Sequence, residues 1–284
     1  MSSAFRITER SLSTSALAGL QAALSQLQDT QDKLSSGKAI ARPSDSPSGT
    51  MNALRLRAGI DRADQLDRNA SDGLARLGTT DNALQDGLST LRSVRDAVVS
   101  GNNAAMSPTD REALAEQVDG LRQSLLATAN TTYLGQPIFA GTSSASTAYD
   151  ANGTYQGDAG TVSRTIAPGV SVAVNSTGID AFGPAGNDIF KALSDISNDI
   201  TSVDAGYVRM QNTLASVGSR YHQIDIMQQR NQVNQLDAKT QLSNVEDVDV
   251  AATTVDLQMQ EVAYQAALGA TARSIQPSLL DFLR

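Results

Sequence analysis

The chain has 284 residues and a formal net charge of −8, and 40% of its residues are hydrophobic although only 4% are aromatic. An acidic chain lacks the basic surface that binds nucleic-acid phosphates or anionic membranes. With no cysteine and one histidine, the sequence also excludes disulfides, thiolate catalysis and cysteine-based zinc sites.

The first part of the chain shows no basic stretch followed by an apolar core, so we expect no ordinary signal peptide. No apolar run approaches the roughly 20 residues that span a bilayer. If the protein leaves the cell, we expect it to do so by a route other than general secretion.

The N-terminal segment predicts a helix with one apolar stripe. Its leucines recur at steps of three, four and seven residues, at Leu17, Leu20, Leu24, Leu27 and Leu34. The prolines and polar residues of the segment 42–49 then predict that this helix ends and that a new one begins at Ser46-Pro47.

A heptad repeat follows and predicts a long helix. Its apolar positions are Leu56, Ala63, Ala70, Leu77, Leu84, Leu91 and Val98. Asp67, Asp81 and Arg95 interrupt the second apolar column. We interpret these three residues as a solvated or register-setting face rather than as a charged site.

Ser107, Pro108 and Asp110 form a helix-start signature and predict a shorter helix. After it the chain becomes rich in Gly, Ser, Thr and Asn from about residue 135 to 186. Short β-type runs at 137–140, 161–166 and 170–174 alternate there with turn sequences. We expect a small β-rich insertion between two helical halves.

An unbroken alternation of four- and three-residue steps predicts one long helix from Ile189 to Ile224. Its apolar positions are Ile189, Leu193, Ile196, Ile200, Val203, Tyr207, Met210, Leu214, Val217, Tyr221 and Ile224.

The C-terminal segment keeps the same spacing at Val255, Met259 and Val262, with smaller residues further on. Glu246, Asp247 and Asp249 precede it, and we interpret these acids as a helix start rather than a metal site, because carboxylates favour that end of a helix. An isolated helix whose apolar stripe consists of small residues is only marginally stable in water. We therefore expect both chain ends to be poorly ordered in the free monomer and to order on assembly.

No candidate catalytic site emerges. His222 is the one histidine, and its neighbours are those of an ordinary helix surface, so we interpret it as a helix residue. The sequence has no phosphate-binding or dinucleotide-binding glycine pattern in a suitable context, and we expect no enzyme activity, no metal and no cofactor.

Two segments resemble those of a known family. Residues 34–38 (LSSGK) and 42–47 (RPSDSP) are similar to the N-terminal signature of bacterial flagellins and their hook-associated relatives. Residues 245–251 (VEDVDVA) resemble the stretch that opens the last helix of that family, and residues 277–284 resemble its short leucine-containing end. The signature residues in this chain are Ser35, Ser36, Gly37, Arg42, Pro43, Ser44, Asp45 and Pro47.

Within this family, the chain looks more like the hook-filament junction proteins than the filament flagellins. The two prolines of RPSDSP, the run ANTT at 129–132 and the run IFAG at 138–141 carry this distinction. Ser46 departs from the family, which usually has a second acid there.

The resemblance implies a mainly α fold with a small β insertion, in which both chain ends form an elongated antiparallel coiled-coil stem and the middle forms a β-rich knob. It implies terminal assembly helices, a helical stem and an insertion, which we place at residues 1–42 with 245–284, 43–134 with 187–244, and 135–186. The residues that we expect to pack against other subunits are Leu17, Leu20, Leu24, Leu27, Leu34, Val255, Met259, Val262, Leu279, Leu280 and Leu283.

By the same resemblance, the protein would be an extracellular subunit at the junction of hook and filament, exported through the flagellar type III channel. Its partners would be hook-associated protein 1, flagellin, copies of itself and a cytoplasmic export chaperone. Three alternatives stay open, namely a filament flagellin, a cytoplasmic coiled-coil signalling rod and an enzyme.

Overall fold

The computed structural model describes residues 9–101, 107–194 and 200–275. They pack as two units. One unit takes Met1–Ile60 with Leu236–Arg284, and the other takes Asp61–Gln235. The predicted division into assembly helices, stem and insertion assigns each range by its expected function, whereas the two units are defined by packing. That division stays a prediction.

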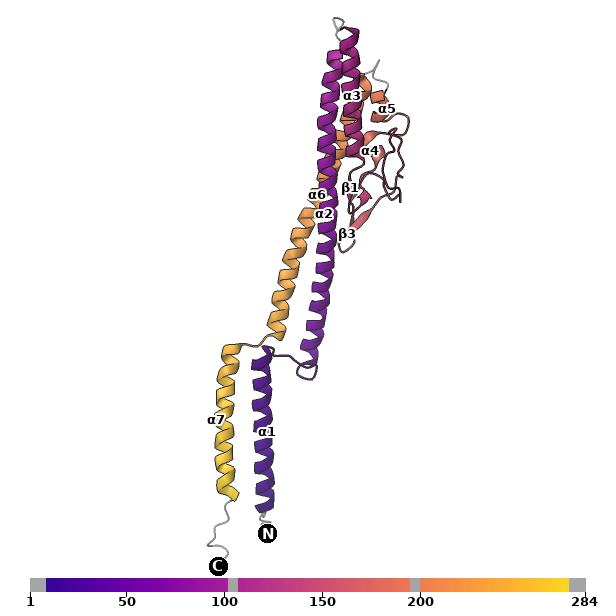
Figure 1. Cartoon of the computed structure of the whole chain (residues 1–284). Helices are drawn as coiled ribbons and strands as arrows, with labels where there is room; N and C mark the ends of the chain where they lie inside the picture. Colours follow the sequence, from indigo (N-terminus) through magenta and orange to yellow (C-terminus); the bar gives the residue numbers. More distant parts are fainter. Residues whose placement is uncertain (1–8, 102–106, 195–199, 276–284) are drawn as a thin grey trace, which may run out of the picture. The chain divides into compact units, whose positions relative to one another are not determined.

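The first unit is built around the two terminal helices. Helix α1 (Glu9–Ser36) and helix α7 (Val250–Ile275) lie side by side and run in opposite directions (Figure 1). The unit also takes the beginning of α2 (Pro47–Gly101) and the end of α6 (Ile200–Glu246). The predicted helix start at Ser46-Pro47 is confirmed, since α2 begins at Pro47 and the Ser46 hydroxyl accepts the Gly49 N–H at 3.1 Å.

In the second unit, α2 and α6 pack together and α3 (Pro108–Ala129) lies beside them (Figure 1). The predicted heptad positions Ala70, Leu77, Leu84 and Leu91 are all buried. The predicted start of α3 is also confirmed, because the Ser107 side chain caps the helix by accepting the Asp110 N–H and Pro108 is its first residue.

The predicted single helix from Ile189 to Ile224 is wrong. Two helices, α5 (Ile189–Ser194) and α6, supply that stripe, and the predicted position Ile196 lies outside the described residues. A Cβ atom at Gly206 would touch the Ile189 side chain, so Ile189 packs on α6 at a point 17 positions further along the chain. Ile189 and Leu193 of α5 are buried in the same core as Val203 and Met210 of α6. A common spacing therefore could not reveal that the chain folds back.

The residues between α3 and α5 form two small antiparallel sheets and a short helix. Strand β1 (Thr132–Tyr133) pairs with β2 (Gln136–Pro137), and β3 (Ser163–Ala167) pairs with β4 (Val170–Ala173). Helix α4 (Gly178–Phe182) follows, with a capping box between Thr177 and Asp180. The predicted β-rich insertion is confirmed, although the strand expected at 137–140 ends at Pro137.

Aromatic side chains form the core of this insertion. The rings of Phe139 and Phe182 meet edge to face at 5.1 Å between centroids, and those of Tyr149 and Phe190 lie 4.8 Å apart. All four residues are almost fully buried. The few aromatic residues of the chain are thus concentrated where a compact core is needed, while aliphatic residues fill the helix seams.

Two of the charged residues that interrupt the heptad column make contacts between helices. The Gln232 amide donates to Asp67 at 3.2 Å, and Arg95 pairs with Asp204 at 2.9 Å. Asp81 instead accepts a hydrogen bond from Gln85 on its own helix. Asp67 and Arg95 thus lie at the solvated edge of the seam and bridge two helices there, while their register-setting role stays a prediction.

Arg220 of α6 fastens the insertion to the long helices. Its guanidinium donates to the carbonyl of Asn175 at 2.6 Å, to the carbonyl of Ala173 at 3.4 Å and to the Ser176 hydroxyl at 2.9 Å. Burial lowers the pKa of Arg220, which is the cost of placing this cation under the insertion. Three acceptors at fixed positions suit the planar fork of an arginine.

We predict that Arg220→Lys loosens this attachment, because an ammonium group cannot reach the three acceptors together. Amide exchange at residues 172–177 should become about 5- to 30-fold faster, as expected for the loss of about 1–2 kcal/mol of local stability. Hydrogen exchange with mass spectrometry measures this. The control is Arg230→Lys at an exposed position of the same helix, and equal exchange in both variants would contradict the role of Arg220.

Candidate assembly site

The described residues contain no group of three or more His, Cys, Asp and Glu side chains that could hold a metal ion. His222 is exposed on α6. Among the described helices, none is long and apolar enough to cross a membrane. The best-built polar cluster lies instead where α1 meets α2 and α6 meets α7, within the first unit.

In this cluster two chain connections pair with each other through their backbones. Gly37 ends α1 with a positive φ of 69°, which glycine adopts without strain. The Gly37 carbonyl accepts the Val248 N–H at 3.0 Å, and the Ala39 N–H donates to the Glu246 carbonyl at 2.7 Å. Lys38 and Asp247 therefore form an isolated antiparallel bridge.

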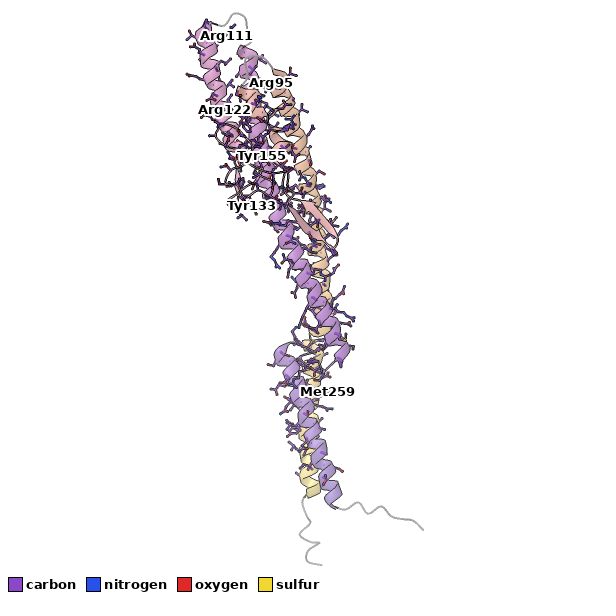
Figure 2. The ribbon with its side chains drawn as sticks, turned by 90° about the vertical axis from the view of Figure 1, so that its right-hand side faces the viewer. Arg95, Arg111, Arg122, Tyr133, Tyr155 and Met259 are labelled. Carbon is purple, nitrogen blue, oxygen red and sulfur yellow. The ribbon has the colours of Figure 1, made fainter. Side chains whose placement is uncertain are left out.

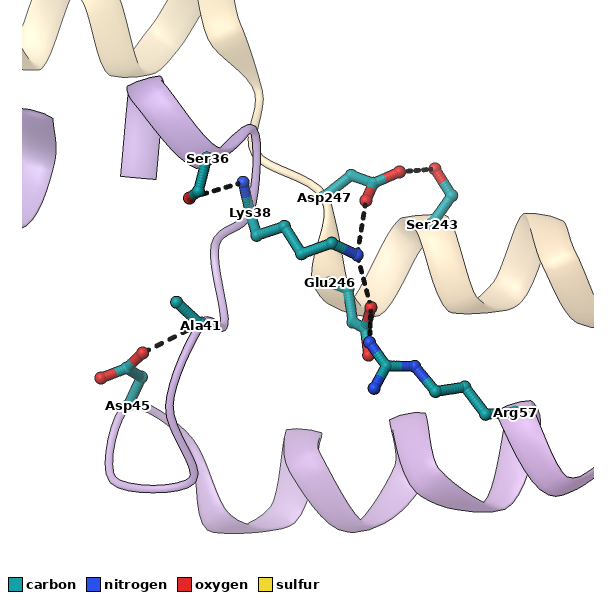
Figure 3. A network of polar contacts seen from close by, with 8 residues as sticks. All are labelled: Ser36, Lys38, Ala41, Asp45, Arg57, Ser243, Glu246 and Asp247. Atoms are coloured by element: carbon teal, nitrogen blue, oxygen red, sulfur yellow. Dashed lines mark hydrogen bonds and ion pairs between the residues drawn. The ribbon is translucent and has the colours of Figure 1, made fainter. Parts of the chain in front are cut away.

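The Glu246 carboxylate is the centre of the cluster, and its side chain is only 4% exposed. Its Oε2 accepts hydrogen bonds from Lys38 Nζ at 2.7 Å and from Arg57 at 2.8 Å (Figure 3). Burial by itself would raise the pKa of Glu246, but the hydrogen bonds and charges of Lys38 and Arg57 outweigh it and hold the pKa below its usual value. We call Lys38, Arg57 and Glu246 the joint triad.

The signature residues beside the joint triad shape the turn between α1 and α2. The Asp45 carboxylate accepts the N–H group of Ala41 at 3.1 Å (Figure 3). It also accepts the N–H group of Arg42 at 2.8 Å, and this bond in particular lowers the pKa of Asp45. The Ser36 hydroxyl accepts the Lys38 N–H at 3.3 Å. Ser35, Arg42, Pro43 and Ser44 are exposed, and Pro47 is the first residue of α2.

The three predicted acids play different parts. Asp249 accepts the N–H groups of Ala251 and Ala252, so it caps α7 as expected for a helix start. Asp247 accepts a hydrogen bond from the Ser243 hydroxyl. The helix-start interpretation is wrong for Glu246, which is the last residue of α6 and turns inward to the joint triad.

The predicted packing stripe of α1 is divided between two environments. Leu20, Leu27 and Leu34 are half-buried, in the helix that packs on α7. Leu17 and Leu24 remain 55% and 39% exposed. Because these two lie one heptad apart, they line the same edge of the stripe, and this edge is still open to solvent.

The predicted stripe of α7 is exposed along its whole described length. Val255, Met259 and Val262 are 56%, 60% and 66% exposed, and Met259 is labelled in Figure 2. The half-buried apolar residues of α7 include Leu257 and Tyr264, which the prediction missed. Leu279, Leu280 and Leu283 lie outside the described residues. We call Leu17, Leu24, Val255, Met259 and Val262 the open stripes.

Sequence reasoning also missed the joint triad. Glu246 lies 208 positions from Lys38 and 189 positions from Arg57, so no local spacing connects them. A usable signal was present in the quoted motifs, because the lysine of LSSGK and the glutamate of VEDVDVA carry opposite charges beside two predicted breaks between helices.

The known proteins that this chain resembles are bacterial flagellins and flagellar hook-associated proteins. A family model described as the bacterial flagellin N-terminal helical region matches residues 7–144. Flagellar hook-associated protein 3 of Salmonella typhimurium is 22% identical over 92% of this chain and 94% of its own length. A flagellin of Bacillus subtilis is 24% identical over 90% of this chain and 92% of its own length.

A solved structure supports the fold. A flagellar hook-associated protein from Vibrio parahaemolyticus superposes with a TM-score of 0.63 at 19% identity, covering 72% of this chain and all of its own. This likeness concerns the arrangement of helices and strands.

We predict that Glu246→Gln destabilises the first unit by about 1–3 kcal/mol, because Lys38 and Arg57 lose their shared charge partner. The value stays below that of a fully buried pair because both cations are about half exposed. Chemical denaturation followed by circular dichroism measures it. Glu261→Gln, at an exposed position of α7, is the control and should change the stability by less than about 0.5 kcal/mol.

Stability of this unit should also depend on acid. The folded pKa of Glu246 lies below its usual value, so its stabilisation is complete above that usual value and disappears as the pH falls through the folded pKa. Denaturation midpoints from about pH 7 to about pH 3 should fall less steeply in Glu246→Gln than in the native chain. Parallel curves would show that Glu246 does not contribute to the acid sensitivity.

Proposed function

Because this chain belongs to the flagellin-like family of flagellar hook-associated protein 3, we propose that it is a structural subunit joining the hook to the filament of the bacterial flagellum. In this role the paired terminal helices pack against neighbouring subunits. The observation that carries the proposal is the exposure of the open stripes on α1 and α7.

The physical argument starts from the division of apolar residues on each terminal helix. The apolar stripe of α1 is half-buried at Leu20, Leu27 and Leu34, while Leu17 and Leu24 at its edge remain exposed. Each apolar side chain that is later buried contributes about 25 cal/mol per Å². A layer of subunits would bury the open stripes, and assembly would supply the burial that a single chain lacks.

The joint triad supports the same role by fixing the two terminal helices at one place. The Gly37 and Glu246 carbonyls bind the opposite connection, so α1 ends and α7 begins in register. Two helices held in this way present the open stripes together rather than separately. Neighbouring subunits would meet a preorganised surface, which lowers the entropy that association costs.

The partners in this proposal are hook-associated protein 1, flagellin and further copies of the chain, with a cytoplasmic chaperone before export. The location would be the extracellular flagellum, reached without cleavage of a signal peptide. The parts of the chain ends furthest from the joint triad would order fully only on assembly, and the proposal assigns no catalytic step or cofactor.

Filament flagellin is the second candidate, and one observation favours it, namely the alignment with a flagellin over 90% of the chain. The two functions differ in growth. A junction subunit forms a short layer on a prepared hook end, whereas a flagellin forms long filaments from its own copies. Electron microscopy of purified protein, seeded on hook fragments with and without hook-associated protein 1, distinguishes them. Long filaments of this protein alone would favour flagellin, and a lack of assembly on every seed would overturn both.

The open stripes can be tested with a matched pair of double variants. Leu17→Gln with Leu24→Gln should keep the helix content and unfolding midpoint but reduce incorporation onto hook ends at least about tenfold, the equivalent of 1.4 kcal/mol of lost contact energy. Leu20→Gln with Leu27→Gln changes the half-buried residues of the same helix. That pair should lower the unfolding midpoint of the free protein.

Incorporation is measured in the seeded assembly, in competition with the native chain. If the Leu17 and Leu24 variant incorporates as well as the native chain, the open stripe of α1 is not a subunit contact.

A further inference from the structure

A groove of about 560 Å³ lies between α6 and the part of the insertion around α4, within the second unit. Its volume is within the range of sites that bind small molecules. Hydroxyl, amide and charged groups line most of it, and its basic members are two arginines. The polar lining residues include Ser176, Asp180, Arg209, Asn212, Ser216 and Arg220.

Helix α6 places both arginines on one face, beside α4 (Figure 1). The residues of this face follow one another at steps of four, three and four, and they are Arg209, Thr213, Ser216 and Arg220. The Thr213 hydroxyl donates to the Asp180 carbonyl at 2.8 Å and thereby holds this face against the insertion. The groove follows this face, so one molecule can contact residues along about three turns of the helix.

The charge of Arg209 is not neutralised by any acidic side chain in the described part of the chain. Its guanidinium forms neither an ion pair nor a hydrogen bond there, although the residue is half-buried. A Cβ atom at Gly183 would touch this guanidinium, so glycine lets it lie against the turn that ends α4. The N–H donors of Arg209 are thus available to a ligand at one place in the groove.

Arg220 is hydrogen-bonded, but its charge is also not paired. The groups that accept its hydrogen bonds are neutral carbonyls and hydroxyls, and they belong to Ala173, Asn175, Ser176 and Ser216. The acid of the groove is Asp180, whose carboxylate accepts the N–H and the hydroxyl of Thr177 at 3.3 and 2.8 Å. Burial lowers the pKa of Arg220, and the charge of Asp180 partly offsets this effect.

The groove therefore contains two guanidiniums and one carboxylate. In a chain with 30 acidic and 22 basic residues, this local excess of positive charge favours an anionic ligand. Arginine binds carboxylates and phosphates through two parallel hydrogen bonds. We propose that the groove binds a small polar molecule that carries a carboxylate or a phosphate together with several hydroxyl groups.

The two arginines have different parts in this site. The acidic group of the ligand binds the free N–H donors of Arg209. Because the N–H groups of Arg220 are already engaged, Arg220 attracts the ligand by its charge alone. The exposed side chains of Asn212 and Ser216 offer hydrogen bonds to the hydroxyl groups of the ligand. A sugar acid or a sugar phosphate has this combination of groups.

Calorimetric titration of the full chain tests the site with three related sugars. Glucuronate carries a carboxylate, glucose 6-phosphate carries a phosphate, and glucose is the neutral analogue. At least one acidic sugar should bind with a Kd below about 1 mM, and glucose should bind at least about tenfold more weakly, because it lacks the charge-assisted bonds to Arg209. The acidic sugar that binds more tightly identifies the preferred acidic group.

Variants of α6 locate the binding. Arg209→Gln should weaken binding of the acidic sugar at least about tenfold. Arg230→Gln is the matched control, because it removes the same charge from an exposed position of the same helix, and it should change the Kd less than about twofold. Asn212→Asp keeps both arginines but adds a negative charge to the groove, so it should also weaken binding. Circular dichroism should show equal helix content in the three variants.

Failure of both acidic sugars to bind would overturn the inference. Equal affinities of Arg209→Gln and Arg230→Gln would overturn it as well, because they would show general attraction by the charge of the chain rather than binding in the groove. The proposed function would survive either result, since the open stripes lie in the first unit.

Discussion

The buried carboxylate of Glu246 is the interaction on which the terminal unit depends. A charge removed from water is costly unless partners neutralise it, and here Lys38 and Arg57 do so from two other segments. Because both cations must reach Glu246, the end of α6, the turn after α1 and the beginning of α2 lie close together. The backbone bridge between Lys38 and Asp247 then fixes where α1 ends and α7 begins. Without this neutralised charge, two terminal helices with modest seams would have little to align them.

In the second unit, an insertion with little regular secondary structure is attached to long helices. Aliphatic heptad positions fill the helix seam, and aromatic residues fill the insertion. Polar contacts hold the two parts in register. Arg220 binds carbonyls of the insertion, and Asn231 donates to the Ile166 carbonyl at 2.7 Å. Buried polar groups with fixed partners specify one arrangement more sharply than apolar packing does.

Both units leave selected apolar residues in water. On the terminal helices these are the open stripes, and in the second unit the most exposed is Leu134. In the proposed function, the open stripes are the contacts with neighbouring subunits.

The sequence by itself determined the helical class, the helix starts at Pro47 and Pro108 and the presence of a β insertion, because heptad spacing, capping residues and turn residues act over short distances. It also identified the apolar stripes, but not which residues of each stripe the chain itself covers. Only the tertiary structure decided that Leu20 is half-buried while Leu17 is exposed, that α5 folds back on α6, and that Glu246 meets Lys38 and Arg57. These outcomes join residues far apart along the chain, and local periodicity carries no information about which distant faces meet.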